Sequence, residues 1–178
     1  MSVPQRFTPQ QDGMLLGRFE PIEADLLRLA TTQLLEMLDS GTTDPQLAAS
    51  DGVFGRLLPD AYRDDDEAAA EFRRFTATGL LERKAQNAQI VLDSLGASEP
   101  DTVTSDSEER QPVMVSVDPD AVQAWLRSLT DLRLTLADRL QISPDGVVHL
   151  ATEDTPFLGE LYEWLGMLQE ELVYAIDV

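Results

Sequence analysis

The chain has no cysteine among its 178 residues. Without cysteine a protein forms no disulfide, offers no thiolate to a metal and has no thiol nucleophile. Histidine is almost as scarce, with His149 as its one example, whereas zinc and non-haem iron sites usually use two or more imidazoles. We therefore expect neither thiol chemistry nor a transition-metal site, and we interpret His149 as a structural residue.

Basic residues are also few. The chain has 13 lysines and arginines against 33 aspartates and glutamates, which gives a net charge of −20. A field of that sign repels nucleic acid and anionic membrane surfaces. No run of about 18 apolar residues is present, as a membrane-spanning helix needs, and the opening MSVPQRF lacks the apolar core of a secretory signal. We expect a cytoplasmic protein without a membrane span.

Motifs of catalysis are missing as well. The chain contains no glycine-rich phosphate-binding loop and no nucleophile motif. The triple acid Asp64-Asp65-Asp66 lacks the alternating ligands and the turn glycine of a calcium loop, so a helix cap explains it better. We therefore expect a protein that is not an enzyme and that binds no cofactor.

The stretch Pro59–Leu95 is interpreted as the element on which the other helices pack. Its apolar residues repeat every three or four positions on both sides of Gly79, which is typical of helices. A pair of helices hinged at Gly79 is the favoured interpretation, and one long helix bent there is the alternative. The residues of the two seams are Ala68, Phe72, Phe75, Leu81, Ala85, Ala88, Leu92 and Leu95.

Turn and cap signals place the rest of one predicted domain, residues 1–178. Asp12-Gly13 predicts a β-hairpin within residues 1–19, and a core helix should run from Pro21 to Ser40 and stop at Gly41. The remaining predictions are helices at Asp118–Leu140 and Asp154–Ala175, short strands at Val113–Val117 and 147–150 that are candidates to pair, a loop over residues 41–58, and a flexible acidic loop over residues 97–112. The fold class is mainly α: a single-domain bundle of about five helices with a short N-terminal β-hairpin and minor strands.

The stretch Pro59–Leu95 is the least acidic part of the chain because it contains four basic residues: Arg73, Arg74, Arg83 and Lys84. Two helices around Gly79 with these cations are a candidate nucleic-acid or partner contact, similar to a helix-turn-helix face. Neighbouring glutamates offer the simpler explanation of a charge-balanced surface. Further along, Arg127 and Asp131 stand four residues apart and predict a structural ion pair.

Four strings resemble the marks of one bacterial family: LLPDAYRDDDEAAAEFRRFT, LLERKAQNAQIVLDSL, AWLRSLTDLRLTLADRL and LYEWLGMLQEELV. It is a domain-of-unknown-function family that includes the oxidative-stress transcriptional regulator AosR and is often encoded beside the ClpS adaptor. The resemblance covers about Phe19–Ile176. It implies a mostly helical fold and a role in redox-responsive transcriptional regulation, with contact to DNA or to the transcription apparatus.

Thiol-based sensing, which the resemblance also implies, is closed to a chain without cysteine. Oxidant sensing would fall to a partner or to a methionine, and the candidate residues are Met14, Met37, Met114 and Met167. The helical patterns predict that Met37 and Met167 are buried, which would make them poor sensors.

Together, the residues and the resemblance predict a regulatory protein of the oxidative-stress response that acts through a protein partner or weak DNA contact. The charge of −20 favours a protein partner, either the transcription apparatus or Clp components. The alternative is a non-enzymatic interaction module linked to Clp proteolysis. The wholly acidic last helix is a candidate for a basic partner, with a solvated face as the simpler explanation. A homodimer is compatible with both hypotheses.

Overall fold

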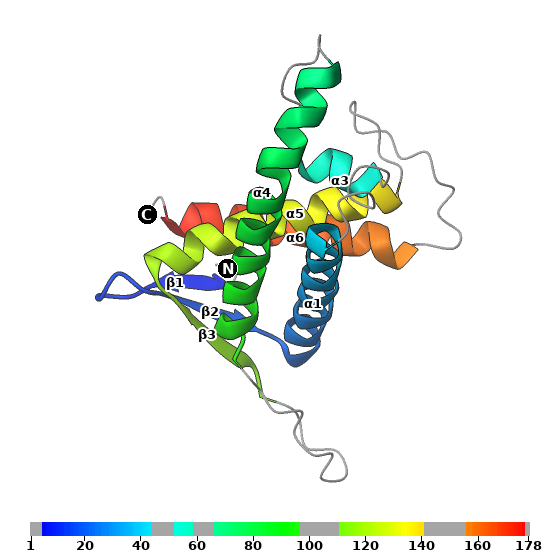
Figure 1. Cartoon of the computed structure of the whole chain (residues 1–178). Helices are drawn as coiled ribbons and strands as arrows, with labels where there is room; N and C mark the ends of the chain where they lie inside the picture. The colour runs from blue at the N-terminus through cyan, green and yellow to red at the C-terminus, as the bar shows by residue number, and fades with distance from the viewer. Residues whose placement is uncertain (1–4, 44–51, 59–65, 97–110, 141–155, 177–178) are drawn as a thin grey trace.

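The computed structural model describes residues 5–43, 52–58, 66–96, 111–140 and 156–176 (Figure 1). These residues form four long helices, one short helix and a three-stranded antiparallel sheet, which confirms a mainly α protein. The helices are α1 (Pro21–Thr43), α3 (Gly52–Leu57), α4 (Asp66–Ser94), α5 (Pro119–Arg139) and α6 (Pro156–Ile176). The strands are β1 (Phe7–Pro9), β2 (Leu15–Phe19) and β3 (Val113–Val117).

The predicted N-terminal hairpin is present as β1 and β2. The Asp12 carboxylate accepts a hydrogen bond from the Met14 N–H (3.1 Å), and Gly13 has a φ of 84°, which an L side chain rarely adopts. Pro9 lies in β1, an edge strand, where a missing N–H is tolerated. β3 pairs with the other side of β2, with Leu15 opposite Val117. The sheet therefore joins the start of the chain to its middle.

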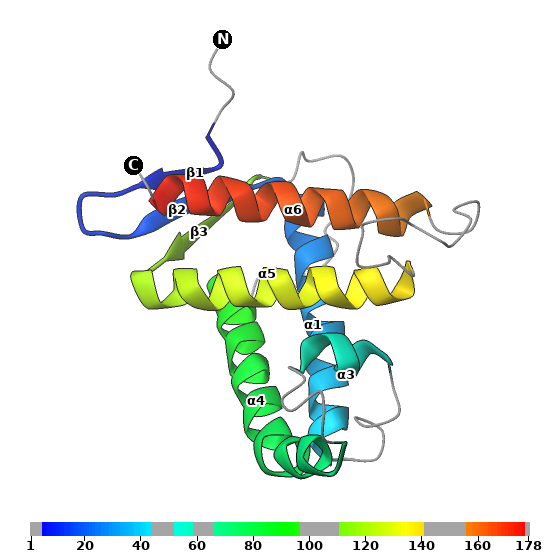
Figure 2. The ribbon, with the colours of Figure 1, turned by 90° about the horizontal axis from the view of Figure 1, so that it is seen from above.

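Helix α5 is the centre of the fold. Figure 2 shows α5 with α6 along one side and with α1, α3 and α4 on the other. The α1–α4 pair crosses α5, whereas α6 runs back beside it in the opposite direction (Figures 1 and 2). The prediction that the other helices pack on Pro59–Leu95 is therefore wrong in one respect, because α5, and not α4, contacts every other described helix.

The sequence around α5 explains why it can occupy that place. Asp118 caps it by accepting from the Ala121 N–H (2.7 Å), and Pro119 takes the first position, so the helix begins where Asp118–Leu140 was predicted to begin. Apolar residues lie on several sides of α5, so neighbouring elements pack against it from more than one direction. The indole of Trp125 is fully buried among them. That ring stacks on Phe19 at 5.8 Å between centroids and meets Phe7 edge-on at 6.5 Å. Aromatic contacts of this kind each add about 0.5–1.5 kcal/mol beyond area burial, and here they attach the sheet to α5.

The predicted hinge at Gly79 does not interrupt α4, which is one continuous helix from Asp66 to Ser94. Four long helices therefore replace the expected five. A single glycine lowers helix stability by only about 1 kcal/mol, which packing along the rest of α4 can offset. The C-terminal seam is confirmed, with Leu81, Ala88 and Leu95 buried. The side chains of residues 66–78, the N-terminal seam included, lie outside the described part of the chain.

Gly41 does not stop α1, which continues to Thr43. Gly41 is buried, and a Cβ built on it would lie 2.5 Å from Cε1 of Phe54 and 3.2 Å from Cδ1 of Leu81. Its small size therefore allows close packing against α3. The prediction of a loop over residues 41–58 is wrong at this point, because α3 lies within that range. The short α3 is held through Phe54 and Leu57, which are both buried.

Some predictions fall on residues that the structure does not describe. They are the strand at 147–150 with His149, most of the acidic loop over 97–112, the helix cap at one of Asp64, Asp65 or Asp66, and the cap of the last helix at Asp154 or Thr155. The predicted pairing of 147–150 with β3 lies there as well. Gly96 follows the end of α4, with its N–H bonded to the Asp93 carbonyl (3.1 Å).

Candidate partner-binding surface

The four predicted contact residues do not share one environment. All four belong to α4. The side chains of Arg73 and Arg74 lie outside the described part of the chain, Arg83 is exposed, and Lys84 is half-buried against α5. The proposed cationic group therefore stays a prediction, and Arg83 is its one exposed member in the part that the structure describes.

Lys84 is engaged in a buried ion pair. Its Nζ donates to Oδ1 of Asp131 at 2.7 Å. Asp131 is only 2% exposed, and its Oδ2 has no hydrogen-bond partner among the described residues. Burial raises the pKa of the Asp131 carboxyl, and the Lys84 ammonium opposes that rise without cancelling it. Lys84 is thus held by the core.

The predicted Arg127–Asp131 pair is wrong. Asp131 turns toward α4, where Lys84 reaches it, whereas the Arg127 side chain is exposed on another face of α5. Two residues four positions apart share a face only approximately, and a buried acid takes the partner that is buried with it.

Arg6 joins three elements at the start of the sheet. Its Nη1 and Nη2 donate to the two oxygens of Glu23 in α1 (2.8 and 3.0 Å), and its Nε donates to Glu171 in α6 (2.8 Å). The guanidinium also lies 5.2 Å from the centre of the Phe19 ring. Burial alone would lower the Arg6 pKa, but the hydrogen bonds that Arg6 donates to Glu23 and Glu171 raise it overall. In Glu23, burial works to raise the pKa, and the bonds from Arg6, the Glu20 N–H and Trp164 lower it overall.

Three other described arginines are also bound within the protein. Arg28 contacts Asp25 (3.1 Å) and the Leu95 carbonyl (3.1 Å), and Arg56 contacts Asp138 (3.3 Å). Arg133 donates to Gln169 (3.1 Å) and lies over the Tyr162 ring. The exposed arginines of the described surface come from four different elements: Arg18 in β2, Arg56 in α3, Arg83 in α4, and Arg127 and Arg139 in α5.

The most distinctive described surface is the outer face of α6. We define the α6 outer face as Glu160, Glu163, Met167, Glu170 and Tyr174, which are all exposed and recur every three or four residues. Met167 and Tyr174 are 55% and 69% exposed. The expectation that Met167 is buried is wrong, because α6 buries the neighbouring stripe of Leu165, Leu168 and Leu172 instead. The acidic run was visible in the sequence, but Met167 within it was predicted to be buried.

The described residues were also compared with the requirements of a membrane span and of a metal site. None of the helices in the described ranges combines the length and hydropathy that a membrane span requires. No three histidine, aspartate or glutamate side chains of these ranges gather as a metal site would need.

Comparison with known proteins gives a consistent result. A family model described as "Domain of unknown function (DUF2017)" matches residues 4–176. Curated relatives from Mycobacterium bovis and Mycobacterium tuberculosis, each named "Oxidative stress regulator AosR", are 30% identical over 186 aligned residues. The alignment covers 88% of this chain and 79% of each relative. No solved structure matches the chain significantly.

Proposed function

The chain belongs to the DUF2017 family, and on that premise we propose that it is a regulatory protein of the oxidative-stress response that affects transcription through a protein partner. The relatives' name supports the regulatory part of this proposal. We propose a non-enzymatic role, because the arrangement of side chains points to binding rather than to chemistry.

The α6 outer face is the observation that carries the protein-partner part. Met167 lies between Glu163 and Glu170 in this row, the exposed Tyr174 follows Glu170, and α6 contains no basic residue. An apolar centre within a polar rim is the usual composition of a protein interface. The acidic rim calls for a cationic partner surface, because charge complementarity guides association and suppresses wrong partners.

Direct DNA binding is the weaker version of the hypothesis. A protein binds DNA by neutralising several phosphates with grouped cations, whereas Lys84 is paired with Asp131 and the described exposed arginines come from four different elements. An electrophoretic shift assay at low and at physiological salt tests the remaining cations. A shift that Arg83→Gln weakens would support DNA contact, and no shift at low salt would exclude it.

The central experiment is binding to purified candidates: RNA polymerase with its sigma factor on one side, ClpS and the Clp protease on the other. We expect binding to the polymerase complex, and we expect Met167→Glu with Tyr174→Glu to weaken it at least tenfold, since two central contacts are lost. Met114→Glu is the matched control, because Met114 is 54% exposed on β3. Equal binding by the wild type, the double variant and Met114→Glu would contradict the role of the α6 outer face.

The second candidate function is an interaction module in Clp proteolysis. The same α6 outer face would then carry the contact, because its chemistry does not depend on which cationic partner is present. Binding to ClpS or the Clp protease, with none to the polymerase complex, would favour this candidate.

Redox regulation without cysteine requires another oxidisable group. Met167 lies in the α6 outer face and is exposed, so that an oxidant such as hypochlorous acid can reach its sulfur. The sulfur gains one oxygen and becomes a sulfoxide, while the oxidant is reduced to chloride. A polar sulfoxide in the centre of the face would weaken an apolar contact there. Oxidation that leaves partner binding unchanged would exclude this form of sensing.

A further inference from the structure

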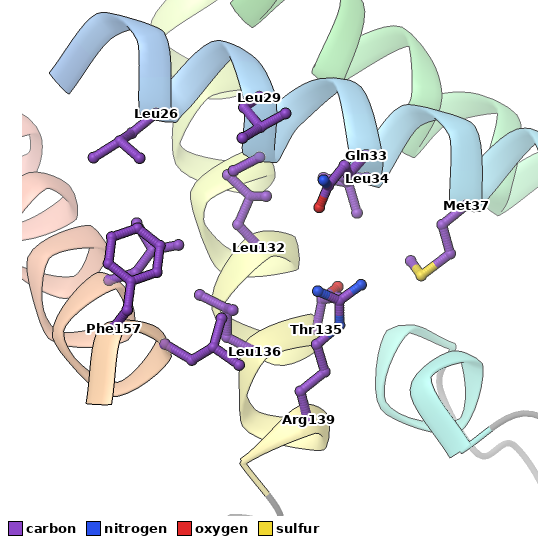
Figure 3. Close-up of a pocket in the computed structure, with 13 residues that line it drawn as sticks. Leu26, Leu29, Gln33, Leu34, Met37, Leu132, Thr135, Leu136, Arg139 and Phe157 are labelled. Carbon is purple, nitrogen blue, oxygen red and sulfur yellow. The ribbon is translucent and has the colours of Figure 1, made fainter. Parts of the chain in front are cut away.

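A pocket of about 190 Å³ opens between α1, α5 and α6 (Figure 3). Its wall is mostly apolar and includes Leu26 of α1, Leu132 of α5 and Leu161 of α6. Two more of its residues, Leu29 and Phe157, are 57% and 52% exposed. Large apolar side chains that stay in contact with water beside an apolar hollow are typical of a surface that binds a ligand.

Arg139 is the one charged residue among the pocket's described lining residues. Figure 3 shows its side chain extending from α5 so that the guanidinium lies beside Thr135, on the side that faces Gln33 and Met37 of α1. The Thr135 hydroxyl already donates to the Asp131 carbonyl (2.9 Å). In a chain with 33 acidic residues, this guanidinium has no carboxylate partner among the described residues, unlike Arg6 and Arg56.

We propose that this pocket binds a short alkyl carboxylate, with the alkyl chain among the leucines and the carboxylate on Arg139. A guanidinium holds a carboxylate through two parallel hydrogen bonds, and the apolar wall gains the burial of each methylene. The proposal is independent of the α6 outer face and of the proposed function, because it concerns a small molecule and a different side of α6.

Charge and size select this class of ligand. A cationic ligand would be repelled by Arg139, and the mostly leucine wall offers few of the donors that a phosphate group needs. The volume of about 190 Å³ is below the roughly 300–1,000 Å³ of sites for drug-sized molecules. An alkyl chain of moderate length, such as that of octanoate, suits the space better than a long-chain lipid.

The methionines provide a direct test, because Met37 lines the pocket whereas Met114 and Met167 are exposed elsewhere. The full chain carrying carbon-13 methionine methyl groups is titrated with octanoate and followed by NMR. We expect a saturable shift of the Met37 signal alone, and weaker binding of octanol and octylamine. Each methylene added between hexanoate and octanoate should tighten binding about fourfold. An unmoved Met37 signal, or equal shifts of the Met37, Met114 and Met167 signals, would overturn the proposal.

Three variants test the role of the guanidinium. Arg139→Gln removes the charge, and Gln33→Glu places a competing carboxylate on the facing turn of α1 with no change in size. Each should weaken octanoate binding about tenfold or more and leave octanol binding unchanged. Arg127→Gln, an exposed arginine of α5 outside the pocket, is the matched control and should bind octanoate as the wild type does. Wild-type affinity in Arg139→Gln, or an equal loss for octanol, would show that no carboxylate is held there.

Discussion

The Lys84 ammonium lies 2.7 Å from the Asp131 carboxylate, and this contact joins α4 to α5, the helix on which the other described helices pack. Removal of the lysine leaves a carboxylate that is almost fully buried without a partner. We therefore expect Lys84→Met to lower the free energy of unfolding at pH 7 by about 2–4 kcal/mol. Urea unfolding measures this value. Arg83→Met, at the neighbouring exposed position, should change it by less than about 0.5 kcal/mol, and similar losses in the two variants would contradict the assignment.

Arg6 should matter more to stability than its place near the start of the chain suggests. Arg6→Gln removes the contacts to Glu23 and Glu171, so that β1, α1 and α6 are no longer joined there. We expect a loss of about 1–3 kcal/mol, measured by chemical or thermal unfolding. Arg18→Gln is the control, since Arg18 is exposed and its nearest acid, Glu20, is 3.9 Å away. A loss of stability no larger than that of Arg18→Gln would contradict the role of Arg6 in joining β1, α1 and α6.

Glu23 and Asp131 should give stability opposite dependences on pH. The Glu23 pKa is lowered in the folded state, so its contribution is present above the ordinary carboxyl pKa of about 4 and is lost as pH falls through the lower folded value. The Asp131 pKa is raised, so the folded state keeps the carboxyl proton to a higher pH than the unfolded state does. Stability therefore falls as pH rises from about 4 to the raised value.

Urea unfolding between pH 2 and pH 7 separates the two groups. The stability difference between wild type and Glu23→Gln should shrink as pH falls through the acid end of this range. The difference between wild type and Asp131→Asn should instead become less favourable to wild type as pH rises above about 4. Slopes of the same sign would contradict the opposite pKa shifts.

Two helix glycines should respond oppositely to alanine. Gly79→Ala meets no atom within 4 Å and should stabilise the protein by up to about 1 kcal/mol, because alanine favours the helix. Gly41→Ala gains the same preference but drives its methyl group into the Phe54 ring, which should cost about 1–3 kcal/mol net. Thermal unfolding reports both. Addition of Phe54→Leu should recover part of the Gly41→Ala loss, and an unchanged loss would show that the ring is not its cause.

Methionine oxidation should follow exposure. Hypochlorous acid should oxidise Met114 and Met167 before Met37, because the first two are more than half exposed and Met37 is partly buried. Peptide mass spectrometry after graded oxidation gives the order. Met167→Leu should make partner binding insensitive to the oxidant, whereas Met114→Leu should not. Oxidation of Met37 first would contradict the packing of α1.

Much of the fold could be predicted from local patterns. Asp12-Gly13 set the hairpin, Asp118-Pro119 set the start of α5, and apolar residues at helical spacing gave α1, α5 and α6 within a few residues. Each signal acts over one turn of chain, through a cap, a backbone angle or a repeated side-chain direction. The same patterns misassigned Met167, because periodicity finds an apolar stripe but does not decide which side of it meets the core.

The tertiary structure alone decided the contacts between distant residues. Lys84 and Asp131 are 47 residues apart, and Arg6 and Glu171 are 165 apart. Gly41 looked like a helix stop until the Phe54 ring explained its size, and Arg139 became a binding candidate only when three helices enclosed a pocket beside it. The sequence determined which segments form helices and strands, because those choices depend on near neighbours. The packing of helices determined partners, exposure and cavities, because these depend on surfaces that meet only in the folded chain.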